Sequence, residues 1–425
     1  MVDRKTIFKY SKNIGTYFSA SLIPMILNLI SNPFIAMNME PEDYAIVGYY
    51  SSFNTLIQPL ILFYMLHYYT KRFYELDELG RKELRATIMK SLIWFSSMLA
   101  ILSLGGVVIY TVFFNKGTSM PLFPYAIMSV MALPLTGVMN LMTCNFRMER
   151  KANDFFKLSV TNGVTLVLLN FLFVVIIKWN AFGKLLAPLI ANTVFFIYCT
   201  YKYKDLIKMP FNKAIFKQML LFCWPLTIAA MLGFFSNGYD RVLLERLGNT
   251  KELGYYCVGW QIATYVNVFQ NAINSTFQPD IFQSISERNW KRLFRVIALQ
   301  ITGIIIIVIS FVLFAPFVIK ILTAGRYMMS VGYTRIMVLS SITGMIYYCL
   351  SQVTIALGYT KITLINKIIS SILIIGMFGV LVPKYQFIGA AWGQVFSYVI
   401  FFIGNMILLY LFMKHKKRSN NAKDI

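Results

Sequence analysis

The chain is built from long apolar runs that follow one another from Ile14 to Met413, with only short polar segments between them. A helix needs about 20 mostly apolar residues to cross the hydrocarbon core of a membrane. In lipid, only helices or closed barrels satisfy every backbone hydrogen bond. The pattern therefore predicts an all-α polytopic membrane protein with about twelve transmembrane helices. The expected spans cover residues 14–37, 44–66, 88–114, 121–146, 158–178, 181–200, 218–244, 253–277, 296–322, 331–357, 362–382 and 387–413.

Polar side chains recur at helical spacing along the eighth expected span. Residues Thr264, Asn267, Asn271, Asn274 and Gln278 follow one another at steps of 3, 4, 3 and 4, so they share one face of a helix. Such a face is costly in lipid unless it lines a wet cavity or meets a partner helix. The stripe therefore indicates either a substrate pathway or hydrogen bonding between packed helices. Both interpretations remain open at this point.

Shorter polar stripes occur on other spans. In the first span, Asn28 and Asn32 lie on or beside a polar face, and in the fourth span Arg147 ends a polar face that begins at Thr136. The third and ninth spans, by contrast, are nearly featureless aliphatic runs, which are typical of helices that face lipid. We therefore take Asn28, Asn32 and Arg147 as further candidate substrate-binding residues.

An adjacent pair of opposite charges, Asp240 and Arg241, lies at the end of the seventh expected span. A continuous helix from Gln218 to Leu247 would be about 45 Å long at 1.5 Å per residue, and it would place Arg241 on one face with Thr227. In that position Arg241 is the basic residue best placed to face a central cavity. The alternative is a charged cluster with Glu245 that anchors the helix end at the membrane interface.

Sequence landmarks recur in the two halves of the chain. An Ile-Phe-Lys triplet precedes the first and seventh spans, a tyrosine and a glycine four residues apart start the second and eighth, and paired small residues begin the sixth and twelfth. The offsets are 208, 211 and 206 residues, which indicates a parallel internal repeat. We therefore predict an amino-terminal six-helix bundle over residues 1–205, a carboxyl-terminal six-helix bundle over 206–413 and a basic cytoplasmic tail over 414–425.

The basic charge of the chain indicates its orientation. The sequence has 40 Lys and Arg residues against 17 Asp and Glu, a net charge of +23, although 58% of its residues are hydrophobic. If both termini are cytoplasmic, thirty of the forty basic residues lie on the inside, which is the positive-inside bias of membrane proteins. We therefore expect a multi-pass membrane protein with both termini in the cytoplasm. This distribution does not point to a nucleic-acid partner.

Residues that usually carry catalysis or metal binding do not cluster in the sequence. The five cysteines lie singly within apolar spans, and His67 and His415 lie at expected membrane edges. No Ser-His-Asp, zinc or phosphate-loop arrangement can be assembled from this set. The acidic residues all lie in loops, in tails or at the ends of spans. We therefore expect a protein that is not an enzyme and that uses no metal and no cofactor.

Several segments resemble landmarks of polysaccharide exporters. Residues 40–48, with their acidic, aromatic and glycine positions, resemble the start of the second span in that family, and the stretch from Asp240 to Tyr256 looks like its counterpart in the second half. Residues 315–319 and 389–393 are similar to later landmarks. Over essentially its whole length the chain resembles Wzx-type flippases of lipid-linked oligosaccharides, in the polysaccharide transporter family of the multidrug/oligosaccharidyl-lipid/polysaccharide exporter superfamily.

The resemblance implies two six-helix bundles that form a V around a central cavity with alternating access, and cationic cavity residues that hold a diphosphate or acidic sugars. Arg241 matches that role. The implied function is transfer of undecaprenyl-diphosphate-linked repeat units, such as those of O-antigen or capsule, from the cytoplasmic to the outer leaflet of the bacterial inner membrane for surface polysaccharide assembly. The implied partners are the lipid-linked oligosaccharide, membrane lipids, and the polysaccharide polymerase and chain-length machinery.

Three alternatives stay open from the sequence. A cation-coupled multidrug exporter of the same superfamily would need a carboxylate embedded in the membrane. A lipid II flippase would be expected to have fourteen spans. A membrane glycan polymerase or glycosyltransferase, which belongs to a different class, would need a sizeable outer loop with catalytic groups. The acidic cluster at residues 40–43 lies in a loop too short for this.

Overall fold

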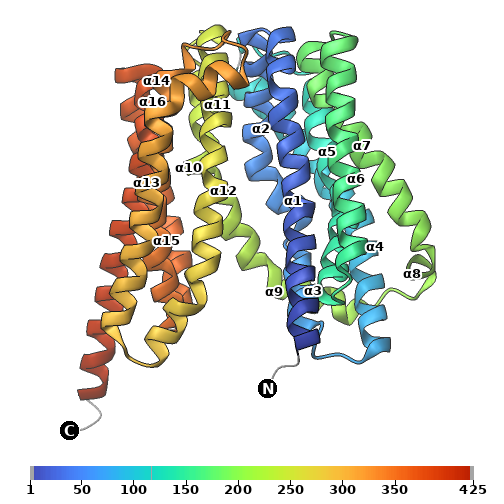
Figure 1. Ribbon diagram of the computed structural model, residues 1–425, viewed down its shortest axis with the longest axis vertical. Helices are drawn as coiled ribbons and strands as arrows, with labels where there is room; N and C mark the ends of the chain where they lie inside the picture. Colours follow the sequence, from blue (N-terminus) through green and yellow to red (C-terminus); the bar gives the residue numbers. More distant parts are fainter. Residues whose placement is uncertain (1–3, 116, 422–425) are drawn as a thin grey trace. The chain divides into compact units, whose positions relative to one another are not determined.

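Helices form all the regular structure of the described chain, as the apolar pattern predicts. The computed structural model describes residues 4–115 and 117–421, and this part contains no β-strand (Figure 1). It divides into two compact units. The first unit runs to Met231 and includes residues 322–326, and the second contains residues 232–321 and the chain from Tyr327 onward.

The first unit is a helical bundle in which α1 packs against α6, and α5 packs against both α4 and α7. Gly163 of α6 allows the close approach to α1, because a Cβ atom at this position would lie 2.4 Å from the Cβ atom of Pro24. The elements of this unit are α1 (Arg4–Asn38), α2 (Pro41–Leu62), α3 (Met65–Arg72), α4 (Glu78–Ile109), the π-helix η1 (Tyr110–Phe114), α5 (Tyr125–Met148), α6 (Ala152–Asn170), the π-helix η2 (Phe171–Ile176), α7 (Asn180–Lys202), α8 (Lys204–Lys208) and α9 (Lys213–Met231).

The second unit is organised around α12, which packs against α14 and α15, and around α16, which packs against α10, α11, α14 and α15. A break at Gln386, where φ is 49° and ψ is −129°, divides α16 into two helices. Residues 414–421 of the expected basic tail continue the second of these, and 422–425 lie outside the described residues. The elements are α10 (Phe234–Asn237), α11 (Tyr239–Glu245), α12 (Thr250–Ser286), α13 (Trp290–Leu322), α14 (Ser330–Val338), α15 (Ser340–Ala356) and α16 (Thr360–Asn421).

Each of the twelve expected spans is mainly helical, although the seventh and the tenth are divided among shorter helices. Eight described helices are long and apolar enough to cross a membrane, and one of these, Lys361–Lys414, contains the last two expected spans. The first expected span is represented by a shorter apolar helix, Leu22–Asn38. The second and eighth lie on α2 and α12, which are long helices but fall outside that apolar set. These two helices carry amide and hydroxyl side chains, and exposure of such polar side chains to lipid is costly.

The expectation of one continuous seventh helix is wrong. The segment is divided into α9, α10 and α11, with Gly233 before α10 and Gly238 before α11. Glycine has a low helix propensity, about 1 kcal/mol less favourable than alanine in a helix interior, so two glycines five residues apart favour interruptions here. As a result, Arg241 and Thr227 do not lie on one continuous helical face.

The break in this segment also coincides with the division between the units. In the first unit, Met219 and Cys223 of α9 are fully buried in the core. Tyr68 of α3 donates a hydrogen bond to Oε1 of Gln218 at 3.1 Å. The short helices α10 and α11 pack against α16 of the second unit. The contacts therefore divide the chain after Met231, whereas the sequence repeat suggested a division after residue 205.

Candidate functional site

A buried ion pair lies in the second unit. Asp240 and Arg241, the second and third residues of α11, are 1% and 0% exposed, and Nε of the arginine lies 3.8 Å from Oδ1 of the aspartate. Charges without solvent are costly unless other groups solvate them. The partners of the pair therefore decide what this site can do.

Asp240 is held mainly through one of its two carboxylate oxygens. The hydroxyl of Tyr256 on α12 donates to Oδ2 at 2.6 Å, and Nε2 of Gln394 on α16 donates to the same oxygen at 2.7 Å. Oδ1 accepts no hydrogen bond within the described chain, and its neighbour is the Arg241 guanidinium. This carboxylate thus links α11, α12 and α16.

Arg241 is only partly satisfied. Its Nη2 donates to the backbone oxygen of Asn237, and its guanidinium carbon lies 3.9 Å from the centre of the Trp260 ring, a cation–π contact. Nε and Nη1 have no hydrogen-bond acceptor among the described residues. An unpaired buried donor costs about 1–3 kcal/mol, and more on a charged group. The guanidinium therefore has unused capacity to bind an anion.

A small polar cavity adjoins this pair. Its volume is about 20 Å³, which is room for about one water molecule. Three residues that line the cavity also contact the ion pair. Trp260 and Asn237 contact Arg241, and Gln394 donates a hydrogen bond to Asp240. The lining residues come from α10, α12, α14, α15 and α16, and they are Asn237, Trp260, Ala263, Thr264, Asn267, Gln270, Met337, Ser340, Gln394 and Tyr398.

The polar stripe of α12 divides into three parts. Thr264 and Asn267 line the cavity, and Asn267 also accepts a hydrogen bond from Ser341 of α15 at 3.2 Å. Further along, Oδ1 of Asn274 accepts from Nε2 of Gln352 of α15 at 2.7 Å. Asn271 and Gln278 have exposed side chains. Two residues of the stripe, Asn267 and Asn274, therefore form hydrogen bonds between packed helices. Two others, Asn271 and Gln278, are exposed, as a substrate pathway requires.

The remaining predicted residues belong to the first unit. Nδ2 of Asn28 donates to the backbone oxygen of Pro24 in its own helix at 3.0 Å, and Asn32 is buried at 9% exposure. Arg147 is exposed at the end of α5, with its guanidinium 5.9 Å from the centre of the Phe155 ring. These three residues therefore do not belong to the Arg241 cluster of the second unit.

Sequence reasoning missed four residues of interest. In the second unit, Gln270, Gln394 and Tyr398 line the cavity. A signal for them was available, because Gln394 and Tyr398 are four residues apart and follow the 389–393 landmark. In the first unit, Lys184 of α7 lies within an apolar run and has neither an ion pair nor a hydrogen bond in the described residues. A lysine within an expected span was the signal for this residue.

The sequence matches the profile of a protein family described as "Polysaccharide biosynthesis protein" over residues 10–284. Among the curated proteins compared, none matches the sequence. The match covers more than half of the chain, and it confirms the predicted relationship to polysaccharide transporters.

Solved transporter structures share the fold. The lipid II flippase MurJ in an inward closed conformation has a TM-score of 0.72 at 15% identity, over 93% of this chain and 87% of that one. An inward-facing multidrug resistance MATE family transporter of the MOP superfamily has a TM-score of 0.70 at 16% identity, over 94% and 99%. A MOP superfamily transporter from Pyrococcus furiosus has a TM-score of 0.61 at 14% identity, over 95% of each chain. The chain is therefore a multi-pass membrane protein with the fold of these transporters, and it belongs to the polysaccharide biosynthesis protein family.

Proposed function

We propose that this protein is a flippase that moves undecaprenyl-diphosphate-linked oligosaccharide repeat units from the cytoplasmic to the outer leaflet of the bacterial inner membrane. Membership of the polysaccharide biosynthesis protein family supports this proposal, and so does the fold shared with a lipid II flippase and multidrug exporters. Both termini lie in the cytoplasm, in agreement with the distribution of basic residues. Transport proceeds by alternating access and involves no catalytic chemistry.

A dedicated protein is needed because the sugars cannot cross lipid alone. Transferring a hydroxyl group from water to an apolar medium without a hydrogen-bond partner costs several kcal/mol. A repeat unit with several sugars would therefore meet a prohibitive barrier. Amide and hydroxyl side chains along the path replace water, and the polyprenyl chain stays in the bilayer.

The observation that carries the proposal is the unused capacity of Arg241. Two of its nitrogen atoms lack acceptors among the described residues, and two residues that contact the guanidinium, Trp260 and Asn237, line a polar cavity. Arginine binds phosphate with two parallel hydrogen bonds, which lysine does not reproduce. The diphosphate of the lipid carrier supplies the oxygen acceptors that the folded chain does not.

Arg241 has no exposed surface in this structure, so substrate contact requires a second conformation. The breaks on both sides of α10 supply flexible positions at which α11 can move relative to α12. In the open conformation, Asn267 and Asn274 exchange their contacts with α15 for contacts with sugar hydroxyls. Thr264, Asn271 and Gln278 extend this path along α12. Asn28, Asn32 and Arg147 are separate candidate substrate contacts of the first unit. The released repeat unit passes to the polysaccharide polymerase and chain-length machinery.

The proposal is tested by substituting Arg241 and measuring glycan export in a strain that lacks the protein. We expect Arg241→Ala to abolish export and Arg241→Lys to impair it, when export is expressed per amount of each variant in the membrane, because removal of a buried charge also lowers stability. Arg295→Lys is the matched control, because Arg295 is an exposed arginine of α13 in the same unit. If both Arg241 variants restore full glycan export to the strain, Arg241 has only a structural role. This result would remove the main support for the proposal.

A second candidate function is a cation-coupled exporter, and one observation favours it. Asp240 is a buried carboxylate with one oxygen free of hydrogen bonds, whereas its position at the end of a span suggested an exposed interfacial residue.

For the flippase, we propose that the membrane potential drives transport and that no cation is coupled to it. About two negative charges that move outward gain roughly 4.6 kcal/mol per 100 mV. Proteoliposomes with a potassium-diffusion potential and no pH or sodium gradient distinguish the two. Transport that ignores the potential but requires a cation gradient, and loses that requirement in Asp240→Asn, would favour the second candidate.

A further inference from the structure

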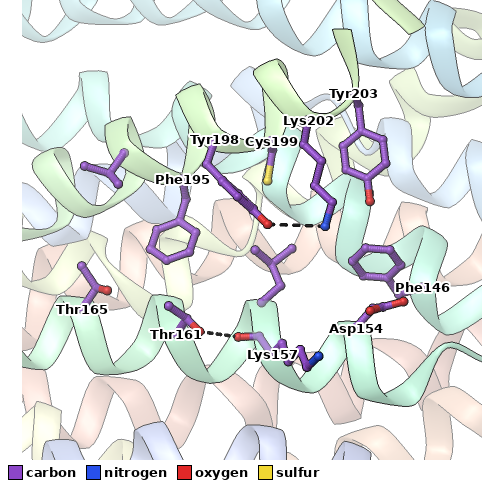
Figure 2. Close-up of a pocket in the computed structure, with 12 residues that line it drawn as sticks. Phe146, Asp154, Lys157, Thr161, Thr165, Phe195, Tyr198, Cys199, Lys202 and Tyr203 are labelled. Carbon is purple, nitrogen blue, oxygen red and sulfur yellow. Dashed lines mark hydrogen bonds between the residues drawn. The ribbon is translucent and has the colours of Figure 1, made fainter. Parts of the chain in front are cut away.

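The first unit contains a groove between α6 and α7 that no step of the proposed transport uses. Its volume is about 420 Å³. Figure 2 shows Lys202, Tyr198 and Phe195 along α7, facing Lys157 and Thr161 of α6 across the opening. We call this feature the α6–α7 groove, and its lining residues are Phe146, Asp154, Lys157, Leu158, Thr161, Thr165, Val194, Phe195, Tyr198, Cys199, Lys202 and Tyr203.

The groove is amphipathic along its length. Its floor is apolar and buried, with Phe146 at 6%, Leu158 at 8% and Phe195 at 7% exposure. Its charged residues lie at one end, where α6 begins and α7 ends, and the ends of two membrane-spanning helices are where we expect the membrane interface. Away from that end, the walls continue along the spans as Val194 and Thr165. A ligand that matches this arrangement has a polar head and an apolar chain.

The charges in the groove are unpaired. Among the described residues, neither Lys157, Lys202 nor Asp154 forms an ion pair, although nearby Lys151 is paired with Glu149 at 2.6 Å. Nζ of Lys202 donates to the hydroxyl of Tyr198 at 3.4 Å. Two lysines and one aspartate leave the groove with a net charge of +1, which an anionic head would neutralise.

We propose that the α6–α7 groove binds one anionic glycerophospholipid, with its phosphodiester between Lys157 and Lys202 and one acyl chain along Leu158, Val194 and Phe195. Asp154 accepts a hydrogen bond from a hydroxyl of the lipid head group, as in phosphatidylglycerol. A lysine at the edge of a membrane packs its carbon stem on apolar surface and keeps its ammonium group at the polar interface. Lys157 and Lys202 could therefore hold a phosphate there while an acyl chain packs on the apolar floor. The bound lipid then forms part of the working protein in the leaflet that the groove faces.

Charge and size favour a phospholipid over the transport substrate. A phosphodiester carries one negative charge and matches the net charge of the groove, whereas a diphosphate carries about two. The groove also lies entirely within one unit, at residues 146–203, and a volume of about 420 Å³ does not accommodate an oligosaccharide together with a diphosphate. The occupant is therefore a component of the bilayer.

Native mass spectrometry of the full-length protein, titrated with phosphatidylglycerol in detergent, tests the proposal. We expect one lipid bound more tightly than the rest, and Lys157→Gln with Lys202→Gln together should weaken its Kd by about tenfold or more, since hydrogen bonds to charged groups contribute about 1.5–3 kcal/mol each. The matched control is Lys204→Gln, because Lys204 is an exposed lysine of α8 that follows Tyr203 in the chain but does not line the groove.

A second pair of variants tests the apolar part of the groove. Val194→Trp should fill the groove and reduce lipid binding, whereas Ile197→Trp on the same helix should not, because Ile197 is 61% exposed but does not line the groove. Thermal unfolding without added lipid shows that both variants remain folded. Equal lipid binding in the wild-type protein and the lysine double variant would overturn the proposal.

Three further titrations identify the occupant. Inorganic phosphate alone should not compete at millimolar concentration, and phosphatidylethanolamine should bind more weakly than phosphatidylglycerol. Undecaprenyl diphosphate should not displace the bound phosphatidylglycerol. Competition by free phosphate would indicate a simple anion site, and displacement by undecaprenyl diphosphate would assign the groove to the substrate. Either result would overturn the proposal for a phospholipid without affecting the test of Arg241.

Discussion

The guanidinium carbon of Arg241 lies 3.9 Å from the centre of the Trp260 ring, so the ring of an α12 residue covers a fully buried charge of α11. The same ring lines the polar cavity. A cation–π contact in a desolvated place contributes about 2 kcal/mol, which offsets part of the cost of the two unpaired nitrogen atoms of Arg241. Movement of Trp260 would therefore expose the arginine and enlarge the cavity in one step.

The Asp240–Arg241 pair should show strong energetic coupling. Removing one partner of a buried pair leaves an uncompensated charge and typically costs about 3–5 kcal/mol. We expect Asp240→Asn and Arg241→Gln each to lower the thermal unfolding midpoint strongly. The double variant should be less destabilised than the two single effects added together. Thermal unfolding of the four proteins in detergent measures this, and strict additivity would contradict the coupling.

The asparagines of α12 should separate into structural and functional positions. Asn274→Ala removes the hydrogen bond from Gln352, so it should lower stability by about 1 kcal/mol. Asn271 is exposed, so Asn271→Ala should leave stability unchanged and lower export if the residue contacts sugars. Export assays together with thermal unfolding of both variants check this. A triple variant combines Asn267→Ala, Asn271→Ala and Asn274→Ala. If this variant exports glycan as well as the wild type, the polar stripe of α12 has a packing role only.

Labelling of single introduced cysteines tests the orientation of the chain. Asn115 lies between the third and fourth expected spans but is buried at 7% exposure, so Ser119 is the better site. We expect Ser119→Cys and Lys251→Cys to react with an impermeant reagent from outside intact cells, and Lys208→Cys to react only after the membrane is opened. The five native cysteines are all buried and serve as an internal background. The reverse labelling pattern would invert the topology.

The loop between α5 and α6 should show a defined pH dependence. Burial alone would raise the pKa of Glu149, but hydrogen bonds from Lys151 and Asn145 and the charges of Lys151 and Arg85 bring it below the usual 4.5. A carboxyl group whose pKa is lowered on folding stabilises the protein above its unfolded pKa, and this contribution is lost as the pH falls through the folded pKa.

The corresponding measurement compares wild type with Glu149→Gln. The variant should unfold at a lower temperature at neutral pH, and the difference should shrink as the pH falls below about 4, where the unfolded group is protonated. Glu75→Gln is a control, because Glu75 forms a more exposed pair with Arg72 in the same unit. A difference that grows toward acidic pH would contradict the lowered pKa.

Much of the helical architecture follows directly from the chain. Apolar runs of about 20 residues are typical of helices that cross the bilayer, and each expected span is mainly helical in the structure. The break in the seventh span is a partial exception. Gly233 and Gly238 were visible, but a glycine alone does not decide whether a helix continues, because tertiary contacts override propensity.

Residues of the candidate site were predicted to different degrees. Arg241, Thr264 and Asn267 came from charge and spacing, and the structure places all three at or beside the cavity in the second unit. Gln394 was missed because its partner Asp240 lies 154 residues away in the chain. Such a contact leaves no local periodic signal, and only the packing of α16 against α11 creates it.

The sequence by itself determined the class of the protein, its helices and its family, because hydrophobic length and polar spacing are local properties of the chain. Only the tertiary structure decided which polar groups are paired. Asp240 and Arg241 are neighbours in any conformation, but their burial, the bonds from Tyr256 and Gln394 and the cover of Trp260 depend on three helices meeting. The energy of a charge depends on its solvation, and solvation is a property of the packed molecule.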